Sequence, residues 1–165
     1  MGKILAMAGT LAEKDVTWFP SYGAEMRGGT ANCTVIISDD MIGSPVVVRP
    51  DLLIIMNTSS LDRFQGRLAK KGLLFFDSSL VKTSVLRRDI KAFPVPATKI
   101  AGALGHTKSA NMVMLGALIA QTGIVNKSSV IHIFETSSHM WKNAGSKINI
   151  HAFSEGIKYI ENKKS

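Results

Sequence analysis

Two apolar runs, LLIIM at residues 52–56 and LLFF at residues 73–76, decide the fold. Continuous apolarity over four or five residues is typical of strands that are covered on both faces, as in a parallel sheet. The stretch between the runs is long enough for a helix, and a right-handed strand–helix–strand crossover makes its two strands parallel. We therefore predict an α/β fold, a mostly parallel sheet with helices on its faces in a single Rossmann-like domain.

The stretch between the two runs carries helix signals. Leu61, Phe64 and Leu68 form an apolar stripe at helical spacing. Ser59 and Ser60 are expected to cap this helix, and Gly72 to end it.

The remaining elements follow from the same patterns. Strands are expected at 16–19, ended by Pro20 because proline cannot donate to a ladder, and at 31–38, 45–48 and 90–93, the last closed off by Pro94 and Pro96. Helices are expected at the amino terminus, after residue 109 and at the carboxyl end. Residues 127–134 fit a strand or a helix, because periodicity cannot assign so short an apolar run, and a helix is preferred. The helix after residue 109 is apolar on all faces, which predicts an interior position, whereas the last one is predicted to be an amphipathic surface helix.

Composition narrows the classes of function. The chain of 165 residues fits one domain, and its formal charge of +8 invites a test for nucleic-acid binding. The basic residues are scattered in pairs without interleaved aromatic side chains, so we expect no nucleic-acid partner. The most apolar run, 112–125, is too short to cross a bilayer, so no membrane association is expected.

A single cysteine limits the redox chemistry. Cys33 cannot form an intramolecular disulfide, and one thiolate cannot hold an iron–sulfur cluster. Its neighbours Val35 and Ile37 predict an inert, buried thiol. The histidines show no paired metal-ligand spacing, so no metal site is assigned. The amino-terminal stretch superficially resembles a secretory signal, but its apolar residues share a helical face, and a cytoplasmic location is expected.

The segment SYGAEMRGGT, residues 21–30, has three glycines and no helical or alternating period, so it is a loop. Most such loops are simple turns. A functional alternative is a ligand or subunit-interface loop, because glycines allow close backbone approach and an arginine fork suits phosphate or carboxylate. The residues assigned to it are Ser21, Tyr22, Gly23, Glu25, Arg27, Gly28, Gly29 and Thr30.

A second candidate precedes the long apolar helix. Lys108, Ser109 and Asn111 lie at or near a helix start, where unpaired N–H groups favour anions. The alternative is an ordinary helix cap with a solvated lysine. No catalytic residue is assigned, because the sequence has no P-loop, nucleophile elbow or dinucleotide fingerprint.

Residues 16–33, VTWFPSYGAEMRGGTANC, closely resemble the gamma subunit of 2-oxoacid:ferredoxin oxidoreductases. Further similarity falls at residues 50–52, 75–80, 95–98 and 110–117, and spans about Gly2 to Ile124. Residues 1–165 are accordingly identified as a gamma-type domain of the pyruvate/ketoisovalerate oxidoreductase kind. Family members usually begin with an apolar strand and a glycine-rich turn, and we expect that both are missing here.

The resemblance implies a role within a larger enzyme. Such enzymes use thiamine diphosphate, magnesium, an iron–sulfur cluster and coenzyme A to decarboxylate a 2-oxo acid oxidatively and reduce ferredoxin. This chain has no Gly-Asp-Gly motif for thiamine diphosphate. The resemblance therefore implies that the chain has a structural role or contributes to the coenzyme A site, and that alone it binds no cofactor and has no activity. The implied partners are alpha and beta subunits, with or without a ferredoxin-type delta subunit, and ferredoxin through the complex.

The amino-acid sequence of this motif is most similar to that of enzymes that convert 2-oxoglutarate to succinyl-CoA. A branched-chain 2-oxoacid or pyruvate enzyme is the alternative within the family. A free-standing anion- or nucleotide-binding α/β domain is the alternative outside it, because fold alone does not fix function.

Overall fold

The structure, a computed structural model, describes residues 1–22, 31–82, 87–137 and 143–164. Its sheet of three parallel strands confirms the predicted α/β class. The strands are β3 (Leu52–Ile55), β4 (Leu73–Asp77) and β5 (Lys91–Val95), in the order β3-β4-β5. Within the described residues β3 pairs only with β4, so its other edge is unpaired.

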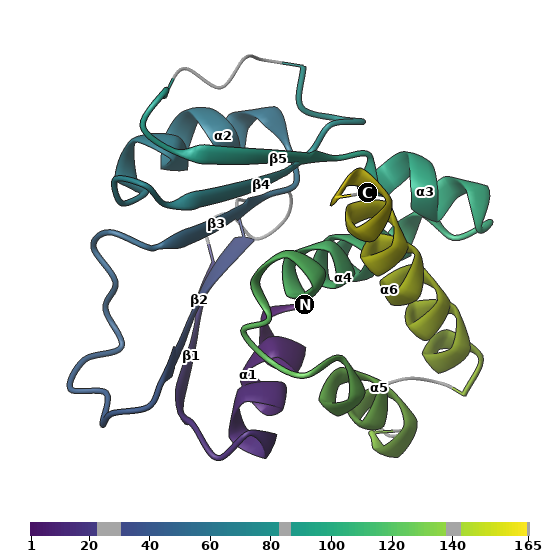
Figure 1. Cartoon of the computed structure of the whole chain (residues 1–165), viewed down its shortest axis with the longest axis horizontal. Coiled ribbons are helices and arrows are strands. Elements are labelled where there is room, and N and C mark those ends of the chain that lie inside the picture. The colour runs from purple at the N-terminus through teal and green to yellow at the C-terminus, as the bar shows by residue number, and fades with distance from the viewer. Residues whose placement is uncertain (23–30, 83–86, 138–142, 165) are drawn as a thin grey trace.

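Helices cover both faces of this sheet, as the apolar runs predicted (Figure 1). Side chains alternate between two cores: Phe75 packs on the side of α4 (Ala110–Thr122), and Leu74 packs on the side of α2 (Thr58–Phe64). Both side chains are fully buried. The helix after β3 is shorter than predicted, because a 3₁₀ turn, η1 (Gln65–Arg67), replaces its last turn.

A separate two-stranded antiparallel ribbon is formed by β1 (Asp15–Tyr22) and β2 (Ala31–Ser38). The helix α1 (Gly2–Leu11) packs against it, and the contact is close: a Cβ on Gly9 would lie 2.9 Å from Val16 Cγ2. The prediction that Pro20 ends the first strand is wrong, since Pro20 lies inside β1 opposite Cys33. A two-stranded ribbon has two open edges, and a proline without an N–H is tolerated on an edge.

The other half of the molecule is helical: α3 (Ala97–Ala103), the 3₁₀ turn η2 (Thr107–Ser109), α4, α5 (Lys127–Thr136) and α6 (Asn143–Lys164). The helix α4 is buried along nearly its whole length, which confirms the interior helix expected from its apolar sequence. The last helix is amphipathic, as predicted, with one face in the core and the other exposed. One side of α6 buries Ala152 and Phe153 in the main core, and Phe153 meets Phe134 of α5 edge to face.

Local predictions failed at four other places. Residues 45–48 form no strand, although three consecutive valines favour one. Asn57 caps α2 in place of the predicted serines, because its side chain accepts a hydrogen bond from Ser60 N at 2.8 Å. The strand β5 runs through Pro94, which occupies an edge of the sheet. The short helix α3 was not predicted.

An arginine–carboxylate pair holds the segment before β5. Arg87 Nε donates to Asp89 Oδ1 at 2.9 Å, and the same guanidinium donates to the carbonyls of Gln65 and Leu68. The hydrogen bond from Arg87 holds the pKa of Asp89 below its ordinary value and raises the pKa of Arg87. The pair therefore ties the start of β5 to the end of η1.

This pair predicts an acid-sensitive contribution to stability. The pKa of Asp89 in the folded state lies below its ordinary value of about 3.9. The pair therefore stabilises the fold at pH values above about 3.9, and this stabilisation is lost as the pH falls through the folded-state pKa. We expect the urea midpoint of the wild-type chain to drop more steeply below about pH 4 than that of Asp89→Asn. Asp62→Asn, an exposed carboxylate on α2, is the charge-matched control and should keep the wild-type pH profile. Identical profiles for wild type and Asp89→Asn would show that the pair contributes nothing.

None of the helices in the described ranges is both long and apolar enough to cross a membrane.

Candidate functional site

The β1–β2 ribbon carries the glycine-rich loop at its tip. The last pair of the ladder is Tyr22 opposite Ala31. Ser21 and Tyr22, which were assigned to the loop, are instead the last residues of β1, because the antiparallel pairing continues past Pro20. Ser21 is exposed at this end of the ribbon. Gly23, Glu25, Arg27, Gly28, Gly29 and Thr30 lie outside the described residues, so the ligand or interface role of the loop stays a prediction.

The ribbon packs on the rest of the molecule away from this end. The apolar side chains of Val35 and Ile37 pack against the main core, and α1 lies close to the ribbon through Gly2 and Gly9. A Cβ on Gly2 would lie 2.4 Å from Cys33 Sγ, so a larger residue here would require the Cys33 side chain to move. Loops on rigid scaffolds are common places for binding residues. The ribbon is therefore suited to presenting its tip to a ligand or to another subunit.

Cys33 differs from the prediction of a buried thiol. It lies near the same end of β2 and is exposed. Its apolar neighbours misled the prediction, because β2 is half-buried only from Thr34 onward, and its first three residues stay exposed although α1 approaches Cys33 through Gly2. Among the described residues no three His, Cys, Asp or Glu side chains gather in a way that could hold a metal ion.

The three residues of the candidate anion site differ in their exposure to solvent. Lys108 is exposed and Asn111 is half-buried, whereas Ser109 is buried. Ser109 Oγ donates to Asn149 Oδ1 on α6 at 3.0 Å and lies 2.8 Å from His106 Nδ1. Its side chain makes no cap hydrogen bond to α4. The Ser109 hydroxyl is thus directed into an internal network that joins η2 to α6, and an anion site at Lys108 and Asn111 stays a prediction.

A polar group that sequence reasoning missed lies at the carboxyl end of β4. Asp77 is fully buried, and its carboxylate accepts hydrogen bonds from Ser79 N at 3.0 Å, Thr98 N at 3.1 Å and Thr98 Oγ1 at 2.5 Å. A buried carboxylate needs such donors, since burying an unsatisfied charge is costly. Its position directly after a buried strand and before two serines was the available signal.

Polar segments follow all three parallel strands at this edge of the sheet: residues 57–60 after β3, 77–79 after β4 and 98–99 after β5. They are joined to one another, because Thr58 Oγ1 donates to the carbonyl of Leu80 at 3.3 Å and Lys99 N donates to Ser79 Oγ at 3.1 Å. Ligands of open α/β sheets bind outside the carboxyl ends of the strands. This edge is therefore the expected ligand side of the sheet, and Asp77 fixes its backbone.

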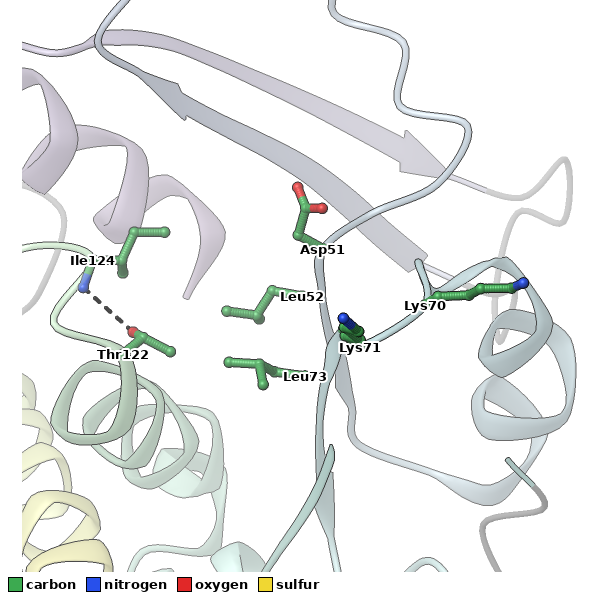
Figure 2. A pocket seen from close by; sticks show the side chains of 8 residues that line it. Asp51, Leu52, Lys70, Lys71, Leu73, Thr122 and Ile124 are labelled. Atoms are coloured by element: carbon green, nitrogen blue, oxygen red, sulfur yellow. Dashed lines mark hydrogen bonds between the residues drawn. The ribbon is translucent and has the colours of Figure 1, made fainter. Parts of the chain in front are cut away.

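An open pocket of about 420 Å³ lies at the opposite, amino-terminal edge of the sheet (Figure 2). Leu52 and Leu73 form one apolar wall, and Thr122 and Ile124 face them from the end of α4. Lys70 points away from this space. Because the pocket lies beside the unpaired edge of β3 and at the amino ends of the strands, it is a weaker ligand candidate than the carboxyl edge.

A parallel sheet between helices, joined to an antiparallel ribbon that ends in a glycine-rich loop, defines an α/β domain whose candidate binding surfaces are loops on a rigid scaffold. The chain belongs to the pyruvate ferredoxin/flavodoxin oxidoreductase family, whose profile matches residues 1–159. The family resemblance inferred from residues 16–33 is thereby confirmed.

Two curated relatives and one solved structure illustrate the similarity. The chain is 41% identical over 120 residues to ketoisovalerate oxidoreductase subunit VorA of Methanothermobacter thermautotrophicus, an alignment that covers 73% of this chain and 25% of the relative. It is 36% identical over 132 residues to 2-oxoglutarate synthase subunit KorC of Methanocaldococcus jannaschii, covering 78% of this chain and 71% of the relative. The gamma subunit of the keto/oxoacid ferredoxin oxidoreductase of Geobacter sulfurreducens has the same fold, with a TM-score of 0.79 and 29% identity over 98% of this chain and 89% of that chain.

The chain thus spans about a quarter of the length of VorA and most of the length of the separate KorC and gamma subunits.

Proposed function

We propose that the chain is the gamma subunit of a 2-oxoacid:ferredoxin oxidoreductase and acts only in the assembled enzyme. The observation that carries the proposal is the extent of the match to a separate gamma subunit, 98% of this chain against 89% of that one. The chemistry of the chain agrees with this role. Its single cysteine does not fit an iron–sulfur cluster, so electron transfer belongs to other subunits.

For the substrate we propose 2-oxoglutarate, oxidised to succinyl-CoA with reduction of ferredoxin. This substrate is supported by the amino-acid sequence of residues 17–29 and by the match to KorC over 71% of that subunit. A branched-chain 2-oxo acid is the second candidate, since the identity to VorA is 41% over a similar share of this chain. In either enzyme thiamine diphosphate, magnesium and the cluster are held by partner subunits, and a cofactor performs the bond-breaking chemistry.

The test is reconstitution with the oxidoreductase subunits of the source organism. We expect the complete enzyme to reduce ferredoxin in the presence of coenzyme A, with the highest kcat/KM for 2-oxoglutarate. A higher kcat/KM for 2-oxoisovalerate would assign the chain to the branched-chain enzyme. A chain that joins no such complex would favour the free-standing anion- or nucleotide-binding domain.

The chain alone is expected to be inactive. Purified from an iron-replete culture, it should show no visible iron–sulfur absorption band and no reduction of a viologen dye with any 2-oxo acid. The complex that contains the same chain is the positive control. A cluster band that co-elutes with the isolated chain would contradict the prediction.

A further inference from the structure

The segment between β2 and β3 contains a sequence that favours a strand but forms none. Residues 45–48, Pro-Val-Val-Val, are here called the valine segment. Val46 and Val48 are 71% and 69% exposed, and only Val47 is half-buried. A β-branched run favours a pleated surface that is covered on at least one face. In this chain the run lacks that cover.

The backbone of the valine segment is also unpaired. Val46 N donates to the nearby Ser44 Oγ at 3.2 Å, but within the described part of the chain no hydrogen bond involves the backbone of Val47 or Val48. Exposed N–H and C=O groups on an extended apolar segment are a template for pairing with a strand of another chain. Local preference and the fold of the single chain conflict here, and such conflicts are expected at functional surfaces.

The occupant that fits is a partner subunit rather than a second copy. About three quarters of VorA lies outside the part that matches this chain, so in that relative a domain of this kind shares one polypeptide with further sequence. A separate subunit can meet the corresponding sequence only on another chain. Pro45, the first residue of the segment, and Pro50, two residues beyond its end, lack amide hydrogens, which limits pairing to a short stretch and disfavours continuous sheets between copies.

We propose that the valine segment docks as a short strand on an edge of a partner subunit of the assembled oxidoreductase. This inference rests on the proposed function. Val46 and Val48 supply the apolar contact because they are exposed on the isolated chain, and Val47 and Val48 supply the free backbone groups. Met41, 92% exposed on the same connecting segment, extends the apolar surface available to the partner.

The double variant Val46→Asp/Val48→Asp tests the inference in the complete enzyme. Because both side chains are exposed, the isolated variant should melt at the wild-type temperature. Its dissociation constant from the other subunits, measured by titration and native mass spectrometry, should rise at least tenfold. Leu11→Asp/Leu80→Asp, which adds the same charge at two other exposed apolar positions, is the matched control and should assemble normally.

Hydrogen exchange of the wild-type chain gives a second measurement that needs no variant. The amides of Val47 and Val48 should exchange freely in the isolated chain and be protected in the complex. The inference would be overturned if these amides stayed unprotected in the complex, or if the control variant weakened binding to the other subunits equally. It would also be overturned if the double variant changed only the self-association of this chain. A wild-type chain that joins no complex would instead overturn the proposed function on which it rests.

Discussion

Replacing Gly156 with alanine is expected to destabilise the chain by about 3 kcal/mol or more, because the helices α4 and α6 touch through their backbones at this point. A Cβ on Gly156 would lie 1.9 Å from the carbonyl oxygen of Val113 and 3.0 Å from Ala117 N. The contact is reciprocal, since a Cβ on Gly116 would lie 2.0 Å from the carbonyl oxygen of Phe153. Backbone atoms cannot rotate away as a flexible side chain can, so the two helices would have to separate.

Separation of these helices would open the main core. Val113, Ala117 and Phe153 are completely buried around the crossing, and each would lose contacts. The gain of about 1 kcal/mol that alanine normally gives over glycine inside a helix is too small to offset this loss. Urea or thermal unfolding of the purified chain measures the effect.

Gly145→Ala is the matched control for this prediction. It makes the same substitution in the same helix at a position where a Cβ would meet nothing within 4 Å. We expect its stability to be unchanged or slightly higher. A Gly156→Ala chain that unfolds at the wild-type denaturant concentration would show that α4 and α6 do not cross this closely.

The sequence predicted those parts of the fold in which local pattern and burial agree. The apolar runs of β3 and β4 are covered on both faces, and the interior helix α4 is apolar all round, so each pattern has one structural solution. The crossing of α4 and α6 could not be predicted, because nothing in the sequence shows that Gly116 and Gly156 meet the backbone of the other helix until the helices are placed together. The valine segment misled the prediction because propensity cannot tell whether a partner strand is present.

For the candidate site, the sequence identified the glycine-rich loop but not how other polar residues are used. Ser21 and Tyr22 were expected in this loop but belong to β1, because the pairing with β2 runs past Pro20. Ser109 was expected near a helix start, yet its hydroxyl is held by His106 and Asn149, and Asn149 lies 40 residues away along the chain. Asp77 was missed because its two donors from Thr98, at the start of α3, are 21 residues away along the chain, and only the parallel sheet brings them to the end of β4. Such long-range hydrogen bonds leave no periodic signal in a sequence.

Replacing Arg27 with alanine in the assembled enzyme is expected to impair acyl transfer to coenzyme A more than decarboxylation. Arg27 belongs to the loop that the β1–β2 ribbon carries, and two glycines follow it directly. A guanidinium fork suits the phosphates of coenzyme A or a carboxylate of a partner subunit. Loss of one charge-assisted hydrogen bond typically costs about 1.5 to 3 kcal/mol, which is on the order of a tenfold to hundredfold change in the affected step.

Separate assays of the two half-reactions measure this effect. Decarboxylation, followed as carbon dioxide release, should keep nearly the wild-type rate, because we propose that thiamine diphosphate is held by other subunits. The KM for coenzyme A or the rate of acyl transfer should change by the predicted factor. Arg67→Ala, at an exposed arginine of η1, is the control for loss of a positive charge and should leave both half-reactions unchanged. An Arg27→Ala enzyme that assembles and transfers the acyl group normally would exclude the ligand role. Failure to assemble would instead make Arg27 a subunit contact, since the guanidinium fork that binds phosphate also binds a carboxylate.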